Sequence, residues 1–335
     1  AVRVVGRRRI RRWLTVFPVH VLRALTLLWV HLSLAHFVFG EFHKARRLLE
    51  KLWGEEEQLE RYNTHDQRLI RGYQIGLLSS IIMHTRLDAE EVYQSTREFM
   101  EVFPEDVNFG RSIGPGYHAV ASFHLGKIDR AQSFIKQALQ ISKHNEYSRM
   151  NMLWSSYRTQ IELTAGDLPR AERYLKQARQ LAESLGTPES SVVSSVIIGF
   201  GYLHYERNQF ESAQELMEKG LAIARDAAFF DYLVWGFPSY LQLLTGQGEY
   251  QKAREALNEI IQLATQNEPS PLLTEQLEAQ QVTLDLEEGK IEPAVFWASE
   301  NNTWEGTADL GPLEYKWLTL ARVWLANDQA PDALP

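Results

Sequence analysis

Charged, amphipathic segments recur along the chain. In residues 168–184 the apolar residues stand three or four positions apart, as at Ala171, Leu175 and Ala178, with charged residues between them. This spacing is typical of a helix that packs one face and exposes the other. Strand signals are nearly absent, and the one β-branched run, residues 192–198, falls inside a helical segment of the repeat described next. The pattern predicts an all-α protein.

A short phrase recurs in these segments: Gly or another turn former, any residue, a large apolar residue, two residues, then Ala. Clear copies begin at Gly40, Gly126, Gly166, Asn208, Gly248 and Gly289, and from residue 126 onward they are 40 to 42 residues apart. Worn copies at residues 85–90 and 328–333 complete eight units of 39–43 residues. A fixed period in this range indicates a stack of helical hairpins.

Each part of the phrase has a physical reason. Gly or Asn ends the first helix of a hairpin, where the left-handed conformation disfavours other residues. Ala lies where the second helix crosses the first closely, and a small residue is expected seven positions before the Gly for the same reason. The sequence therefore predicts a right-handed superhelical solenoid of about eight helix-turn-helix repeats that are tetratricopeptide-like (TPR-like).

An uncharged stretch of seventeen residues, 24–40, follows an Arg-rich start and resembles a signal sequence or a short membrane anchor. It contains His31, Ser33 and His36, however, and it is in register with the first repeat. We therefore expect the first helix of a repeat here and no membrane segment.

Composition narrows the function classes. The 335 residues include no Cys, which excludes disulfides, Cys-ligated metal sites and a thiol nucleophile. The formal net charge is −8, but residues 1–12 carry six Arg and no acid, so the rest of the chain is more acidic still. We expect residues 1–12 to be a basic arm or linker from an upstream domain and residues 13–335 to be the repeat domain.

The phrase, the period and the opening together resemble the large MalT-like transcriptional activators of the LuxR family. Trp13-Leu14-Thr15-Val16-Phe17-Pro18 followed by Val21-Leu22-Arg23-Ala24 is similar to the opening of their superhelix. The chain has neither a GxxxxGK[S/T] phosphate loop nor a helix-turn-helix signature after Ala333, so ATPase chemistry and direct DNA binding are not expected of it. The resemblance implies the middle part of a longer cytoplasmic regulator, in which the superhelix receives an inducer, contacts the other domains and helps to control self-association.

No catalytic constellation stands out. The His residues are scattered, and no HExxH pattern occurs. We interpret the acidic pairs as solvated helix faces and turns rather than as acid–base pairs. We therefore expect no enzyme activity, no metal and no cofactor. Two interruptions with Gly and Pro, residues 109–116 and 304–312, are either ordinary inter-repeat loops or, for the first, a loop whose backbone N–H groups meet an anionic ligand.

The remaining candidate for a functional site is a binding surface on the solenoid. First helices are expected to line the concave face of the solenoid, and counting back from the Gly positions selects its candidate ligand-binding residues. Counting gives Phe123, His124, Gln160, Tyr202, Tyr205, Glu206 and Gln242, and Tyr157 and Trp235 lie at or one step from the same positions. They suit a small polar organic inducer held by stacking and hydrogen bonds, or a peptide or protein partner of a generic TPR scaffold. The alternative, favoured for Tyr157 and Trp235, is that the rings simply pack between repeats.

Overall fold

The computed structural model describes most of the chain. The described residues are 30, 32–34, 36–37, 42–53, 60, 63–108, 110–144, 148–184, 191–226, 230–266, 269–301 and 314–327. They form α-helices joined by short turns, without any strand in those ranges. The basic arm, the Trp13–Pro18 opening, the phrase at Gly40, the interruption at 304–312 and the last worn copy lie outside the described residues.

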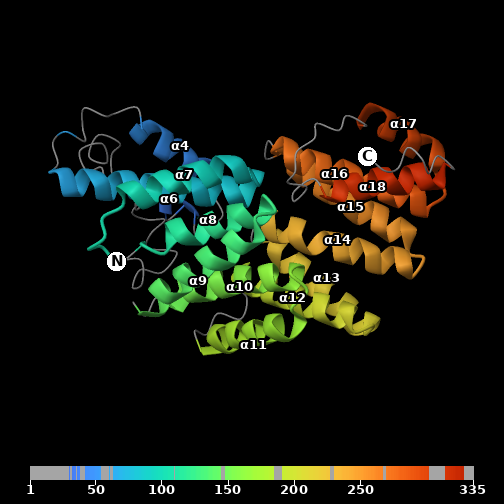
Figure 1. The fold of residues 1–335 in the computed structure, drawn as a ribbon, viewed down its shortest axis with the longest axis horizontal. Helices are drawn as coiled ribbons and strands as arrows, with labels where there is room; N and C mark the ends of the chain where they lie inside the picture. The colour runs from blue at the N-terminus through green and yellow to red at the C-terminus, as the bar shows by residue number, and fades with distance from the viewer. Residues whose placement is uncertain are drawn as a thin grey trace.

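The helices alternate as the repeat predicts. First helices are α6 (Thr64–Arg86), α8 (Ile113–His124), α10 (Ser148–Thr164), α12 (Ser191–Glu206), α14 (Phe230–Gly246), α16 (Pro271–Glu287) and α18 (Glu314–Ala326). Second helices are α4 (Phe42–Trp53), α7 (Ala89–Val102), α9 (Ile128–His144), α11 (Leu168–Ser184), α13 (Phe210–Asp226), α15 (Tyr250–Gln266) and α17 (Ile291–Asn301). Successive helices pack on each other, and the hairpins follow a curve from α4 through α11 to α18 (Figure 1). The all-α solenoid of TPR-like hairpins is confirmed.

The turns and crossings confirm the phrase residue by residue. Gly126, Gly166, Gly248 and Gly289 have φ between 72° and 79°, and Asn208 has φ 58°. The residue after each donates its N–H to the carbonyl five positions back, as from Lys127 to Ser122, which is the Schellman pattern that ends a helix. The Ala of every clear copy is fully buried: Ala45, Ala131, Ala171, Ala213, Ala253 and Ala294 are all 0% exposed.

The worn copy at residues 85–90 was predicted in the wrong register. Leu87, two residues later than the predicted turn position Thr85, is the left-handed residue, with φ 54°, and it donates its N–H to Ile82. Val92 then takes the place of the Ala and is 0% exposed, whereas Glu90 is exposed. The Leu87 side chain is 1% exposed, so burial offsets the steric cost of a left-handed Leu.

The Gly-rich segment at 109–116 is explained by packing. Helix α8 begins at Ile113, so Gly114 and Gly116 are helical. A Cβ on Gly116 would lie 2.4 Å from the Trp154 ring, and one on Gly114 would lie 2.3 Å from Phe99. These glycines let α8 approach its neighbours closely. From Ile113 onward the segment is helix and not the inter-repeat loop that the sequence suggested.

The solenoid closes on itself. Helix α6 contacts α14, although most of the repeats separate them in sequence (Figure 1). Beside this contact Ser270, the N-cap of α16, donates its N–H to Arg86 O at 3.0 Å and its hydroxyl to Leu87 O at 3.2 Å. Ser270 is 3% exposed. The turn between α6 and α7 is therefore tied to the start of α16.

The described part of the uncharged stretch belongs to the first repeat. Val30 and Leu32 are 5% and 6% exposed, and Leu34 and Phe37 pack against the cluster formed by α4 and α6. None of the helices in the described ranges is long and apolar enough to cross a membrane.

Candidate functional site

Five aromatic side chains from four first helices meet inside the superhelix. His84 of α6, Tyr117 of α8, Trp154 and Tyr157 of α10 and Tyr232 of α14 are each at most 2% exposed. The Tyr232 ring lies 6.2 Å from that of His84 and 5.7 Å from that of Tyr157. His84 Nε2 and Tyr117 Oη are 2.9 Å apart, at hydrogen-bond distance. We call these five residues the interior aromatic cluster. They fill the space between α6, α8, α10 and α14, whereas the sequence suggested that the first helices line an accessible concave face.

Helix α10 is buried although it is rich in polar residues. Ser156, Thr159 and Gln160 are at most 2% exposed, and Glu162 is 0% exposed. Ser156 forms a hydrogen bond with Ser195 of α12, and the Thr159 hydroxyl donates to a backbone carbonyl of its own helix. Gln160 Nε2 has no hydrogen-bond partner among the described residues. Buried polar groups are usually hydrogen-bonded, and the Gln160 amide nitrogen is one of several exceptions among the described residues.

Glu162 joins three helices. Its carboxylate accepts from Arg158 Nε at 2.6 Å and from Arg170 Nη1 of α11 at 3.2 Å. Gln132 of α9 approaches the same carboxylate at 3.5 Å, and the Arg158 guanidinium lies 5.0 Å from the ring of Tyr174. Because each charge meets an opposite one, this network holds α9, α10 and α11 together; it has the character of a structural ion pair rather than of a reactive site.

The structure places the nine predicted residues in three environments. Tyr157 and Gln160 are each 1% exposed, so for Tyr157 the packing alternative describes the structure. Glu206 and Gln242 are exposed. The remaining candidates are half-buried: Phe123, His124, Tyr202, Tyr205 and Trp235.

Two groups of half-buried candidates form. The Phe123 and His124 rings, at the end of α8, lie 5.1 Å apart. Tyr202 of α12 and Trp235 of α14 pack against the same apolar cluster, whose buried residues belong to α10, α11 and α12. Burial, reinforced by the charge and hydrogen bonding of Glu206, raises the pKa of Tyr202 to about 12. We call Tyr202, Tyr205, Glu206, Trp235 and Gln242 the α12–α14 surface.

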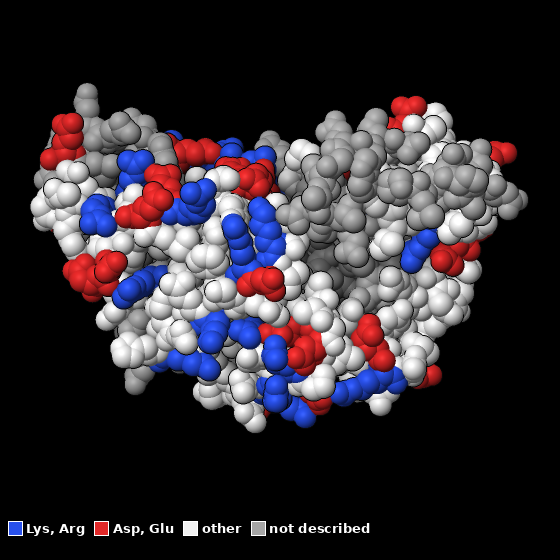
Figure 2. Space-filling model, viewed as in Figure 1, with Lys and Arg blue, Asp and Glu red and all other residues white. Residues whose placement is uncertain are grey.

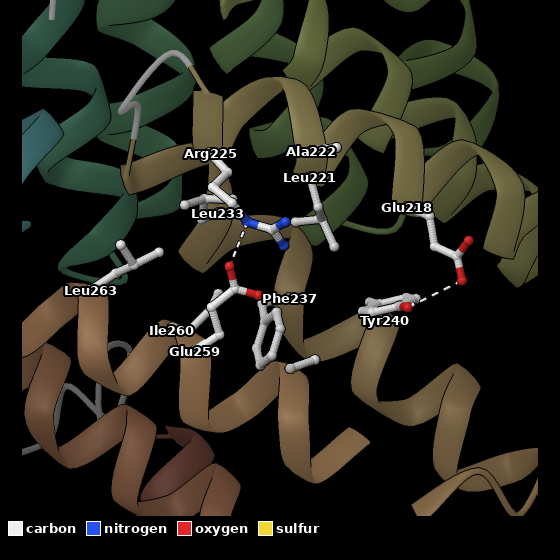
Figure 3. A pocket seen from close by; sticks show the side chains of 11 residues that line it. Glu218, Leu221, Ala222, Arg225, Leu233, Phe237, Tyr240, Glu259, Ile260 and Leu263 are labelled. Carbon is white, nitrogen blue, oxygen red and sulfur yellow. Dashed lines mark hydrogen bonds and ion pairs between the residues drawn. The ribbon is translucent and has the colours of Figure 1, made fainter. Parts of the chain in front are cut away.

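A pocket that the sequence did not reveal lies between α13, α14 and α15 (Figure 3). It has a volume of about 200 Å³ and an apolar floor that includes Leu221, Leu233, Phe237 and Ile260. The repeat frame selects candidate residues only from the concave face of first helices. It therefore could not predict a pocket that α14 shares with the second helices α13 and α15.

Two ion-paired groups border this pocket. At one end the Tyr240 hydroxyl donates to Glu218 at 3.2 Å, and Lys252 pairs with the same carboxylate at 2.6 Å. At the other end Arg225 pairs with Glu259 at 2.7 Å (Figure 3). Burial and the Glu218 charge raise the pKa of Tyr240 to about 12, so its hydroxyl stays protonated and donates. The pocket can hold a small apolar group, but its polar groups already satisfy one another.

Metal-binding geometry is absent from the part of the chain that the structure describes, because no three His, Asp or Glu side chains converge there.

The comparison with known families decides what kind of superhelix this is. The profile of the MalT-like TPR region matches residues 74–335, which is most of the chain. The chain belongs to this family. The match begins inside α6 and runs through every later hairpin, so the family resemblance of the sequence is confirmed for that part.

Solved structures show the same fold at low sequence identity. A Rap protein complexed with Competence and Sporulation Factor has a TM-score of 0.60 and 14% identity, covering 92% of this chain and 94% of its own. NprR in complex with its cognate peptide NprX has a TM-score of 0.58 and 12% identity, covering 91% and 85%. The Rap conjugation gene regulator of plasmid pLS20, in complex with the Phr* peptide, has a TM-score of 0.54 and 10% identity, covering 93% and 98%. None of the curated protein sequences compared with the chain matches it significantly.

Proposed function

We propose that this chain is the effector-sensing and protein-interaction superhelix of a MalT-like transcriptional regulator of the LuxR type. The observation that carries the proposal is the family match over residues 74–335. In this proposal residues 1–12 link the superhelix to an upstream domain, residues 13–335 form the repeat domain, and the regulator acts in the cytoplasm. The superhelix works by binding and leaves catalysis and DNA contacts to other domains.

The α12–α14 surface is the effector site of this proposal. It combines half-buried rings, which offer flat apolar area, with the exposed carboxylate of Glu206 and the exposed amide of Gln242. Rings provide stacking and the polar groups fix orientation, which is the usual division of labour in a small-molecule site. A small polar organic molecule with hydroxyl or amine groups fits this chemistry.

Binding activates a regulator only if the active arrangement holds the effector more tightly than the inactive one. A coupling of about 1–3 kcal/mol is typical of such systems. The closed superhelix offers a physical route, because a ligand on α12 and α14 touches the helix that contacts α6. In this proposal effector binding shifts the contact between α6 and α14, and with it the surface available for self-association.

Calorimetric titration with a panel of sugars, amino acids and other polar metabolites tests this proposal. Two substitutions at exposed positions, Glu206→Gln and Gln242→Ala, should weaken binding about tenfold each without unfolding the chain. Matched controls are Glu215→Gln on α13 and Gln262→Ala on α15, which are also exposed but lie on second helices. Equal effects of test and control variants would exclude the α12–α14 surface.

A second candidate is a peptide or protein partner. It is favoured by the solved neighbours, two of which are complexes with peptides. Fluorescence anisotropy with labelled peptides distinguishes the two proposals. Tight peptide binding that Gln242→Ala weakens, together with no response to any metabolite, would favour the peptide over the small effector.

A further inference from the structure

A second surface, far from α12 in the chain, has the features of an anion site. An open pocket of about 750 Å³ lies on α7, α8 and α9. The residues that line it include Tyr93, Arg97, Met100, His118, Arg130 and Phe134. None of these residues belongs to the α12–α14 surface or to the interior aromatic cluster.

The floor of the pocket is aromatic and fixed. The His118 ring lies 4.3 Å from that of Tyr93 and 4.4 Å from that of Phe134. His118 Nδ1 and Thr96 Oγ1 are 2.9 Å apart, and His118 is 3% exposed. Burial, together with the charges of Arg130, Arg97 and Lys127, lowers the pKa of His118 to about 4, so the imidazole is neutral at pH 7. Phe134 and Met100, which are half-buried, offer apolar area to a ligand.

Three cations surround this floor. Arg97 and Arg130 line the pocket, and Lys127 lies 4.4 Å from the centre of the Tyr93 ring. Arg130 also donates to the Tyr93 hydroxyl. Over the ranges that the structure describes, none of the three cations forms an ion pair with a carboxylate, including those of Glu101 and Asp129 in the same pocket.

This arrangement differs from the rest of the surface. Basic and acidic side chains are interspersed over the N-terminal and middle helices (Figure 2), and many of the Arg residues there are paired, as are Arg71 and Arg207. In a chain with a net charge of −8, three unneutralised cations around one pocket raise the local concentration of anions. A guanidinium binds carboxylate and phosphate oxygens through paired hydrogen bonds.

We propose that the pocket on α7, α8 and α9 binds a small organic anion, a carboxylate or phosphate monoester that carries a flat apolar group. The anionic group pairs with Arg97 and Arg130, and the flat group lies against Phe134 and Met100. The proposal is independent of the effector site, because it involves other helices and other residues.

Calorimetric titration of the whole chain with four probes tests the proposal. Phenyl phosphate and benzoate carry both features, inorganic phosphate carries only the charge, and phenol carries only the ring. We expect one of the first two to bind at one site per chain, and the relative affinities of these two to show whether the site prefers phosphate or carboxylate. Phosphate alone and phenol should bind at least tenfold more weakly.

A variant pair separates a site from general charge attraction. Arg97→Gln removes one of the two guanidinium groups that pair with the anion, so it should reduce the affinity for the preferred probe about tenfold. The substitution should not disturb the fold, because Arg97 makes no ion pair among the described residues. Arg173→Gln, at an exposed position of α11, should leave the affinity unchanged. The proposal is overturned if neither aromatic anion binds at millimolar concentration, or if both variants bind it equally well.

Discussion

The Glu162 network allows a sharp test of how the hairpins are held together. Glu162 and Glu183 both pair with an Arg four residues before them, Arg158 and Arg179. The side chains of the first pair are 11% and 0% exposed, and those of the second are 67% and 62% exposed. The same substitution, Glu to Gln, therefore removes the same type of ion pair from a buried and from an exposed place.

The two variants should differ strongly in stability. Removing one partner of a buried pair costs about 3–5 kcal/mol, because the other charge stays buried without compensation. We expect the lower end, about 3 kcal/mol, for Glu162→Gln, since Arg170 is 43% exposed and keeps its contact with Asp167. An exposed pair contributes about 0.2–1 kcal/mol, so Glu183→Gln should change stability by about 0.5 kcal/mol or less.

Urea unfolding followed by tryptophan fluorescence measures this difference, because Trp154 lies on α10 and is fully buried. Repeat proteins can unfold in steps, so hydrogen exchange of the α10 amides should accompany it. Both readouts should show a large loss for Glu162→Gln alone. Equal losses of stability in the two variants would refute the reasoning that burial increases the contribution of the Glu162 ion pairs to stability.

Three further outcomes are expected. Ser270→Ala removes an N-cap bond and the hydroxyl bond to Leu87, so it should cost about 1–2 kcal/mol and speed hydrogen exchange at the start of α16; unchanged exchange would contradict the closure contact. Gly116→Ala should cost about 1–3 kcal/mol in urea unfolding by overpacking against Trp154, whereas Gly246→Ala, with nothing within 4 Å, should be neutral or stabilising. The unfolded chain binds the His118 proton below about pH 6.5 and the folded chain only near pH 4, so stability should fall as pH drops through that window. His118→Gln should flatten this pH dependence. An unchanged slope of stability against pH would show that His118 is not its cause.

The local structure was predictable because it depends on contacts within one unit. Gly at the helix end and Ala at the crossing are both dictated by steric limits, so spacing alone located Gly126 and Ala131 correctly. The register failed at Leu87 because burial of a large apolar side chain there outweighs the preference for Gly, and the phrase carries no information about burial.

The candidate site was predictable only in part. The helical period selects one face of each first helix, and Glu206 and Gln242 on that face are exposed. It cannot reveal that Tyr232 meets His84, because that contact depends on the curvature accumulated over several units. For the same reason the burial of Gln160 and the pocket of Figure 3 emerged only from the structure.

The measurement that most directly tests the central claim, a stack of hairpins closed on itself, uses the absence of Cys from the chain. Spin labels at Glu90→Cys on α7 and Gln266→Cys on α15 occupy exposed positions on either side of the Ser270 contact. Double electron–electron resonance should give one short, narrow distance distribution. A long or broad distribution would show an open, extended solenoid and contradict the account.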